Sequence, residues 1–373
     1  MKIAIMAPLV TAIREPQRGG SQSFVSDLAR GLAGRGHDVH VYAASGSEIP
    51  GVEVIDTGID PRSLAGTLYR ASGPSESEPG EAGSAEAAAA AESAFTSAYM
   101  TMRVIRYDVV HNHAFDAPAV TLAAGLGTPV VHTLHLPPDR AVATALRYAE
   151  KCGKPPVVAA VSASQARDWR RAARVDAVLP PLVPTASIGW SRSAGQGALF
   201  GGRLSPEKGA AEAIDIARAA GIPIDVYGDP YDADYAREQI GPRRALPGVT
   251  VHPGVPRASL WAAMARAAVV LYPVGWDEPF GMAAAEAQAC GTPVVAFRRG
   301  ALGEVIAGGR TGFLVPPGDT RAAADAVIRA ADISRPACRD HAEAHLDLER
   351  SLDEHERLYR RVAGLGAGAQ ASA

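Results

Sequence analysis

The chain alternates short runs of Val, Ile and Ala with segments whose apolar residues recur at helical spacing, and Gly and Pro lie in the connections. Parallel strands covered by helices on both faces have this pattern, because both faces of such strands must be apolar. The clearest helix is Ser21–Ala33, with Phe24 and Leu28 on its apolar face. In the first half we expect strands at Ile3–Met6, Val39–Tyr42, Val52–Asp56, Val109–Asn112, Val130–Leu134, Val157–Val161 and Val175–Leu179. The pattern predicts an α/β fold.

A proline-rich stretch, Leu179–Pro184, interrupts this alternation and predicts a domain boundary, since prolines continue neither a helix nor a central strand. We expect one domain over 1–181 and another over 182–347. The second sheet is predicted to contain six strands, at Ala198–Gly201, Ile224–Tyr227, Val249–His252, Val269–Tyr272, Val294–Phe297 and Phe313–Val315.

Length and charge exclude several function classes. A chain of 373 residues with 47% hydrophobic residues can bury two cores. A net charge of −3 lacks the basic surface that nucleic-acid binding requires. We find no apolar run of the roughly 18 to 20 residues that span a bilayer, and the three cysteines are widely spaced. We therefore expect no nucleic-acid partner, no transmembrane segment and a cytoplasmic location.

The segment Ser72–Ala94 departs from the pattern, because it has few large apolar residues and contains five glutamates. Its composition favours disorder that leads into an alanine-rich helix. A lid over an acceptor site is the alternative, since long insertions in compact domains are often functional.

The most informative motif runs from Trp276 to Ala287, after the predicted strand Val269–Tyr272, and we expect it to open a helix with Pro279 near the first position. Glu278 and Glu286 are then on the order of 10 Å apart, at ~1.5 Å per residue. Retaining glycosidases need carboxylates ~5 to 5.5 Å apart. Glu278 and Glu286 are too far apart for that chemistry, and their spacing suits different hydroxyl groups of one long ligand. In the structural alternative, Glu278 is a helix cap and Glu286 is a solvated helix residue.

Two loops carry further candidates. Gly201–Gly209 follows the first strand of the second domain, and its Arg203 and Lys208 can bind a diphosphate. Gly19-Gly20 lies between the first strand and the first helix, where a backbone can approach a ligand. This loop is not G-x-G-x-x-G, which argues against a dinucleotide-dependent dehydrogenase.

Histidines follow two strands of the first domain, in His111-Asn112-His113 and in His132-Thr133-Leu134-His135. Both groups lie at the carboxyl ends of strands, where ligands of open α/β sheets bind. A zinc site is a weak alternative, because the spacing is not that of a tight ligand cluster. For His111 and His132 a structural role in the core is as good an interpretation as a functional one.

Asp232-Ala233-Asp234 matches a D-x-D pattern whose carboxylates can hold a metal ion against a diphosphate. It follows Asp229-Pro230, where we expect a helix to begin, and acidic residues are favourable at a helix start. We therefore predict a local role at this helix start, where the acidic residues complement the helix dipole, and no metal ion or other cofactor.

Two of these motifs resemble those of retaining GT-B glycosyltransferases, specifically glycosyltransferase family 4. The resemblance rests on E-P-F-G-x4-E at Glu278–Glu286, followed by A-C-G-T-P-V-V-A, and on G-R-L-x-x-E-K-G at Gly202–Gly209. It implies two Rossmann-like domains that face each other across a cleft, with a C-terminal helix over 348–373 that crosses back to the first domain. One departure is Leu179–Pro184, where family chains often read I-P-N-G-V-D.

The resemblance also implies roles. Glu278, His135, Arg203 and Lys208 would be catalytic, and His113 and His135 would contact the acceptor. Glu286 would bind the ribose hydroxyls, and Arg203 and Lys208 the pyrophosphate. The implied donor-binding residues are Gly19, Gly20, Arg203, Lys208, Gly228, Glu278, Phe280, Gly281, Met282 and Glu286.

The function that these motifs favour is transfer of a sugar from a nucleoside diphosphate sugar, UDP-sugar first, to a hydroxyl of a small-molecule acceptor, without a metal ion. A non-hydrolysing sugar-nucleotide epimerase shares the architecture but not the E-P-F-G-x4-E motif. A catalytically silent sugar-nucleotide-binding protein is the third interpretation, and the complete set of charged motif residues argues against it.

Overall fold

The computed structural model describes residues 1–17, 19–67, 81–152, 155–193 and 195–365. These residues form two compact units, each built on one parallel sheet. Unit 1 comprises Met1–Arg14, Ser21–Pro181 and Glu349–Ala373. Unit 2 comprises Glu15–Gly20 and Leu182–Leu348.

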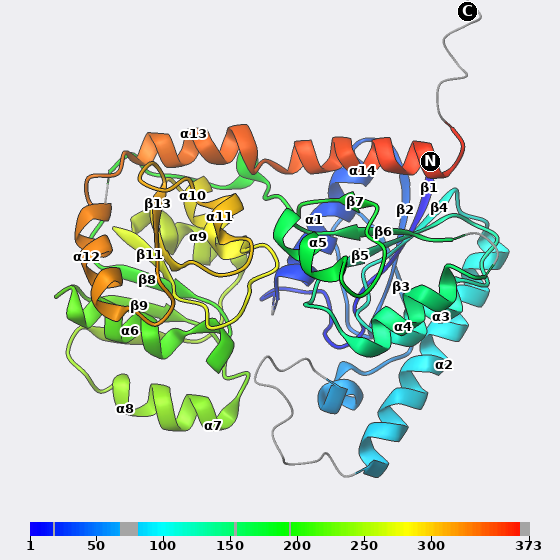
Figure 1. Ribbon diagram of the computed structural model, residues 1–373, viewed down its shortest axis with the longest axis horizontal. Helices are drawn as coiled ribbons and strands as arrows, with labels where there is room; N and C mark the ends of the chain where they lie inside the picture. Colours follow the sequence, from blue (N-terminus) through cyan, green and yellow to red (C-terminus); the bar gives the residue numbers. More distant parts are fainter. Residues whose placement is uncertain (18, 68–80, 153–154, 194, 366–373) are drawn as a thin grey trace, which may run out of the picture. The chain divides into compact units, whose positions relative to one another are not determined.

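The sheet of unit 1 has seven parallel strands in the order β3-β2-β1-β4-β5-β6-β7 (Figure 1). Its strands are β1 (Lys2–Met6), β2 (Asp38–Ala43), β3 (Glu53–Asp56), β4 (Val109–Asn112), β5 (Val130–Leu134), β6 (Val157–Ala160) and β7 (Ala177–Val178). In the centre, Ile3 of β1 pairs with Val39 on one side and with Val109 on the other. The order reverses direction between β1 and β4, so this sheet has its topological switch point there.

Helices cover both faces of this sheet. They are α1 (Gly20–Gly34), α2 (Glu81–Ile105), α3 (Ala117–Ala123), α4 (Arg140–Ala149), α5 (Ala163–Trp169) and α14 (Leu348–Val362), with the short 3-10 turn η1 (Pro61–Thr67). The predicted apolar face of α1 is confirmed, since Phe24 and Leu28 are fully buried. Helix α2 begins inside the segment for which we predicted disorder leading into a helix, and residues 72–80 of that segment lie outside the described residues.

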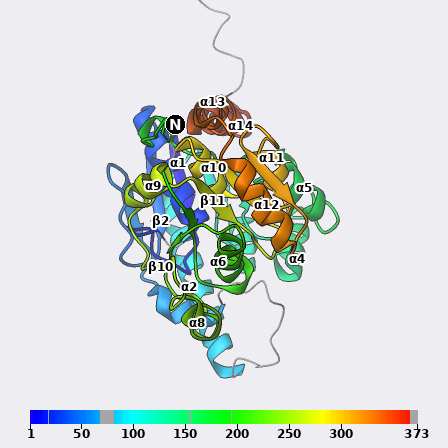
Figure 2. The same ribbon diagram turned by 90° about the vertical axis from the view of Figure 1, so that its left-hand side faces the viewer.

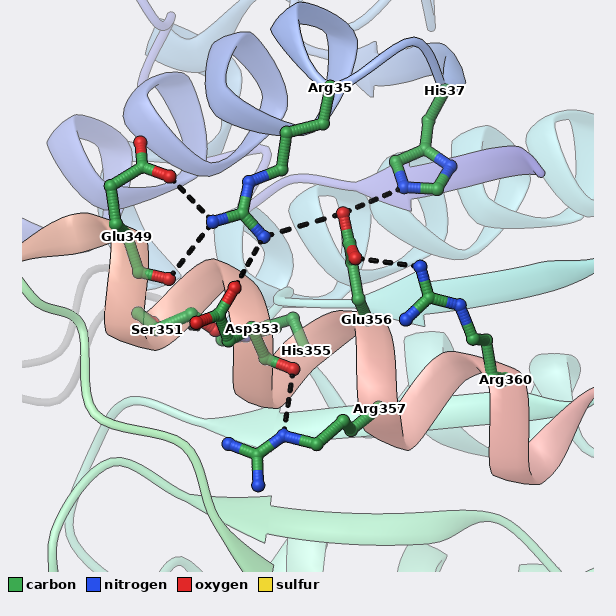
Figure 3. A network of polar contacts seen from close by, with 9 residues as sticks. All are labelled: Arg35, His37, Glu349, Ser351, Asp353, His355, Glu356, Arg357 and Arg360. Carbon is green, nitrogen blue, oxygen red and sulfur yellow. Dashed lines mark hydrogen bonds and ion pairs between the residues drawn. The ribbon is translucent and has the colours of Figure 1, made fainter. Parts of the chain in front are cut away.

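The C-terminal helix α14 packs on unit 1, as predicted. Leu352, Leu358 and Tyr359 recur at helical spacing and are buried. Gly31 of α1 permits this approach, because a Cβ there would lie 2.6 Å from Leu352 Cδ1. On the outer side of the contact, Arg35 donates to Glu349 and to Asp353 at 2.8 Å (Figure 3). Helix α14 is therefore an integral layer of unit 1.

The sheet of unit 2 has six parallel strands in the order β10-β9-β8-β11-β12-β13. The strands are β8 (Ala198–Gly201), β9 (Ile224–Tyr227), β10 (Val249–His252), β11 (Val269–Tyr272), β12 (Val294–Phe297) and β13 (Gly312–Val315), all of which the sequence predicted. Because the order reverses direction between β8 and β11, the loops after these two strands flank the switch point.

The core of unit 2 lies between the sheet and α6, the π-helical turn η4 and α12. Figure 2 shows α6 beside α12, and α9 and α10 lie apart from them. The helical elements are η2 (Thr185–Ser187), η3 (Pro206–Lys208), α6 (Ala210–Ala219), α7 (Ala233–Tyr235), η4 (Ala236–Ile240), α8 (Gly241–Arg243), α9 (Arg257–Arg266), α10 (Met282–Ala289), α11 (Leu302–Val305), α12 (Thr320–Ala330) and α13 (Arg335–His345). Within the described ranges of both units, we find no helix with the length and apolar character that a bilayer crossing needs.

Candidate functional site

Charged residues of unit 2 meet at the switch point between β8 and β11. The loop after β8 carries Lys208 at the end of η3, and the loop after β11 carries Trp276 and Glu278. Lys208 Nζ donates to Glu278 Oε2 at 2.8 Å. Trp276 Nε1 donates to the same oxygen at 2.7 Å. Two sequence motifs seventy residues apart therefore form one polar cluster beyond the carboxyl ends of adjacent strands.

The Lys208–Glu278 pair is largely buried, so its charges are less screened by water than those of an exposed ion pair. Glu278 is 8% exposed, and Lys208 Nζ lies 4.8 Å from the centre of the Trp276 ring, within cation–π range. Below it, burial raises the pKa of Tyr272 well above its usual value, and the negative charge of Glu278 adds to this effect. Sequence reasoning missed Trp276 as a partner, although it lies two residues before Glu278.

Arg203 lies on the same loop as Lys208 but has different partners. Its Nη2 donates to Glu207 Oε1 at 3.1 Å, and its guanidinium carbon lies 4.2 Å from the centre of the Tyr231 ring. Both cations of the G-R-L-x-x-E-K-G motif are thus paired with carboxylates of unit 2. A diphosphate that binds here competes with, or shares, these contacts.

The start of α10 differs from the prediction in one respect. Pro279 does not occupy the first helical position, because α10 begins at Met282 and Gly281 is its N-cap. Gly281 has φ +106°, and a Cβ there would lie 2.6 Å from Leu302 Cδ2. A conformation that only glycine adopts readily therefore delays the helix by three residues, and Phe280 is buried in the preceding loop.

Glu286 is buried inside α10, so the interpretation as a solvated helix residue is wrong. It is 6% exposed, and Arg257 donates to its Oε1 from Nη2 at 2.8 Å and from Nε at 3.2 Å. The Arg257 guanidinium also lies 4.7 Å from the centre of the Trp261 ring. Sequence reasoning missed Arg257 and Trp261, since nothing local links the start of α9 to α10.

Two glycines of the predicted donor site have packing reasons within unit 2. A Cβ on Gly228 would lie 1.9 Å from the Gly202 carbonyl oxygen, so the loops after β8 and β9 touch through their backbones. Gly20 belongs to the short Glu15–Gly20 segment that groups with unit 2, and a Cβ there would lie 3.0 Å from Met282 Cγ. Gly19 lies in this segment too.

The D-x-D motif has the predicted local role. Asp232 Oδ1 accepts from the Tyr235 backbone N–H at 2.9 Å and caps α7. Asp234 forms an ion pair with Arg237 at 2.7 Å. Among the described residues, no group of three or more His, Cys, Asp or Glu is arranged to hold a metal ion.

The histidines of unit 1 form a second cluster, on and directly after the adjacent strands β4 and β5. His113 Nδ1 and His135 Nε2 are 2.8 Å apart, so the two predicted acceptor residues are hydrogen-bonded neighbours. His111 bonds Thr133 Oγ1 through Nε2 at 2.7 Å and the Tyr359 hydroxyl through Nδ1 at 2.5 Å. The second bond ties α14 to the sheet, which supports the structural interpretation of His111.

Burial keeps these imidazoles neutral. It lowers the pKa of His111 and His113 well below the usual value, and their histidine neighbours add to the shift. It lowers the pKa of His132 and His135 to about 3. His355 of α14 packs against the same rings, and burial lowers its pKa to about 4. At neutral pH these side chains accept or donate single hydrogen bonds without carrying charge.

Comparisons with known families cover most of the chain. The model described as Glycosyl transferases group 1 matches residues 195–344, and the model described as Glycosyltransferase Family 4 matches residues 18–187. A D-inositol 3-phosphate glycosyltransferase of Xylanimonas cellulosilytica is 30% identical, over 87% of each chain. One from Acidothermus cellulolyticus is 28% identical, over 89% of this chain and 83% of the relative.

Solved structures have the same fold. Sucrose-phosphate synthase from Thermosynechococcus elongatus superposes with a TM-score of 0.76 at 20% identity, over 98% of this chain and 100% of that one. HepE of Anabaena in complex with UDP-glucose superposes with a TM-score of 0.71 at 20% identity, over 96% of this chain and 99% of that one. This chain belongs to glycosyltransferase family 4 and is a glycosyltransferase with the GT-B fold.

Proposed function

We propose that this glycosyltransferase transfers a sugar from a UDP-sugar to a hydroxyl of a small-molecule acceptor, with retention of anomeric configuration and without a divalent metal ion. The observation that carries the proposal is the pairing of Lys208 with Glu278 across the switch point of unit 2. A cation and a carboxylate held together there suit a ligand that has a diphosphate beside a sugar. HepE, with the same fold, has been solved with UDP-glucose.

Each part of the nucleotide sugar is assigned to a residue of unit 2. Lys208 and Arg203 bind the diphosphate and stabilise the leaving UDP, which makes a metal ion unnecessary. Lys208 has three N–H donors, so it can bind phosphate and retain its contact with Glu278. Lys208 and Trp276 both donate to Glu278 Oε2, and a sugar hydroxyl is assigned to its Oε1. Glu286 accepts from the ribose hydroxyls.

The proposed chemical step keeps the reaction on one face of the sugar. The bond between the anomeric carbon and the phosphate oxygen breaks, and its electron pair leaves with UDP. The acceptor oxygen bonds the same carbon from the same face, and its proton passes to the departing phosphate oxygen. Glu278 Oε2 already accepts from Lys208 and Trp276, and the proposed step uses no covalent glycosyl–enzyme intermediate.

The acceptor is assigned to the His113 and His135 end of unit 1, where neutral imidazoles can bond hydroxyl groups. Relatives named D-inositol 3-phosphate glycosyltransferase make inositol 3-phosphate the first acceptor to test. Other cyclitols, sugars and natural-product alcohols complete the panel.

The function is tested in two stages. Nucleotide sugars are first ranked by thermal shift, since a ligand at 100 times its Kd adds about 2.7 kcal/mol of stability. The best donor is then incubated with each acceptor, and the anomeric configuration of the product is read by NMR. An inverted product would contradict retention. Donor conversion without any acceptor would favour the epimerase, and tight binding without turnover on the whole panel would favour the silent binding protein.

Removing either cation of the diphosphate site will weaken UDP binding. Hydrogen bonds to charged groups contribute about 1.5–3 kcal/mol, so Lys208→Ala and Arg203→Ala should each raise the Kd for UDP roughly 10- to 100-fold and slow turnover. Isothermal titration calorimetry measures the change. The control is Arg237→Ala, which removes an exposed arginine that pairs with Asp234. Wild-type affinity in both test variants would remove these residues from the site.

Chelation of divalent cations will leave the activity unchanged, because Lys208 and Arg203 neutralise the diphosphate. Turnover is compared in excess EDTA and in added Mg²⁺ or Mn²⁺, with enzyme that has been dialysed against chelator. Activity that disappears in EDTA and returns with either metal would contradict metal independence.

A further inference from the structure

The strongest feature that the proposed function leaves unused is Arg257, the first residue of α9. Arg257 is 9% exposed, and its guanidinium donates twice to Glu286 Oε1. Among the described residues, no hydrogen bond reaches Glu286 Oε2. One oxygen of the carboxylate is therefore held by the protein, and the other is available to a ligand.

The position of Arg257 is locally unfavourable. A positive charge at a helix N-terminus opposes the helix dipole, and the preceding Pro256 offers no side-chain cap. The carboxylate of Glu15 partly compensates, since its Oε2 accepts from the Arg257 backbone N–H at 3.0 Å within unit 2. Burial of an ion pair also costs desolvation that its Coulomb attraction often fails to recover. Stability alone is therefore a weak reason for this arginine.

The geometry of the pair fits a positioning role. Both bonds end on one oxygen, and the Trp261 ring 4.7 Å away limits the motion of the guanidinium. Glu278 has the same arrangement, with Lys208 and Trp276 both donating to Oε2. In each case two donors hold one oxygen of the carboxylate, which restricts the directions that the other oxygen can take.

We propose that Arg257, braced by Trp261, is a positioning residue that directs Glu286 Oε2 toward the ribose 2′- and 3′-hydroxyls of the donor. The inference rests on the proposed function, which assigns the ribose to Glu286. Its consequence is selectivity: the enzyme distinguishes a ribonucleotide from a 2′-deoxyribonucleotide through a carboxylate whose orientation Arg257 determines.

The test compares the Kd for 2′-deoxyuridine diphosphate with the Kd for UDP. In the wild type the ratio should be roughly tenfold or more, because one hydroxyl bond to a charged group is missing. Arg257→Met and Glu286→Gln should both bring the ratio close to one. Arg257→Lys keeps the charge without the two-donor geometry and should give an intermediate value. A substitution that merely loosened the fold would weaken both nucleotides equally and leave the ratio unchanged.

A double-mutant cycle separates positioning from a direct contact. If Arg257 acts through Glu286, the double variant Arg257→Met with Glu286→Gln has the same ratio as Glu286→Gln alone. Arg266→Met, an exposed arginine at the other end of α9, is the matched control and should keep the wild-type ratio.

Different results would contradict the UDP-sugar donor and the positioning role of Arg257. A wild-type protein that does not bind UDP would overturn the proposed donor, and this inference with it. Tight UDP binding with an unchanged ratio in Arg257→Met would overturn this inference alone.

Discussion

Acidification from pH 7 to about pH 4 will unfold unit 1. The buried histidines have folded-state pKa values far below the ~6.5 of an unfolded chain: burial lowers those of His132 and His135 to about 3 and that of His355 to about 4. Burial also lowers the pKa of His111 and His113 well below the usual value. The unfolded chain therefore binds more protons than the folded one throughout this range.

The sign follows from proton linkage. Stability is fully present above pH ~6.5, where both states are neutral, and it falls as the pH decreases toward the folded-state values. Each histidine contributes up to about 1.4 kcal/mol per pH unit within that window. The groups around them are neutral aromatic and hydroxyl side chains, including Phe24, Thr133 and Tyr359, so no carboxylate among these contacts offsets the imidazolium charge.

Urea unfolding between pH 7.5 and 4.5, followed by circular dichroism, gives the slope of the unfolding free energy against pH. The steepest slope should correspond to the uptake of several protons on unfolding. His355→Gln should reduce that number of protons by about one. Phe24→Leu is the control, since it weakens packing against the same histidine rings and should lower stability by a similar amount at every pH. A wild-type slope near zero below pH 6.5 would contradict the prediction.

Deletion of the chain from Leu348 onward will cost unit 1 most of its stability and abolish turnover. The deletion exposes the partners of Leu352, Leu358 and Tyr359, and burial of each such side chain contributes about 1.5–3 kcal/mol. It also removes the bond from Tyr359 to His111 and the Arg35 contacts in Figure 3. The sum is comparable to the ~5–15 kcal/mol of a whole domain.

Thermal unfolding and turnover of the truncated chain measure this loss. The matched control is deletion of Gly364–Ala373 alone, which should leave both close to wild type because the exposed Leu365 contributes little burial. Tyr359→Phe is a milder variant that removes only the hydroxyl contact with His111. Wild-type melting and activity after the long deletion would show that α14 is dispensable.

The sequence by itself determined the strands, because the pattern that predicts them is local. Runs such as Val269–Tyr272 and Val294–Phe297 are apolar throughout, as central parallel strands must be, and they match the structure residue for residue. The predicted strand Val175–Leu179 is shorter in the structure, where β7 covers only Ala177–Val178 and ends one residue before Pro180. An edge strand followed by prolines has few pairing partners, so the apolar run overestimates it.

The motifs also identified the charged residues of the candidate site, but they did not predict which of these residues form ion pairs with one another. Sheet order alone brings Lys208 beside Glu278, since β8 and β11 are neighbours although α6, β9, β10 and α9 separate them in the sequence. The same reason explains why Arg257 escaped prediction as the partner of Glu286. Periodicity reports which face of an element is apolar, whereas the pairing of buried charges depends on which elements become adjacent, and only the tertiary structure decides that.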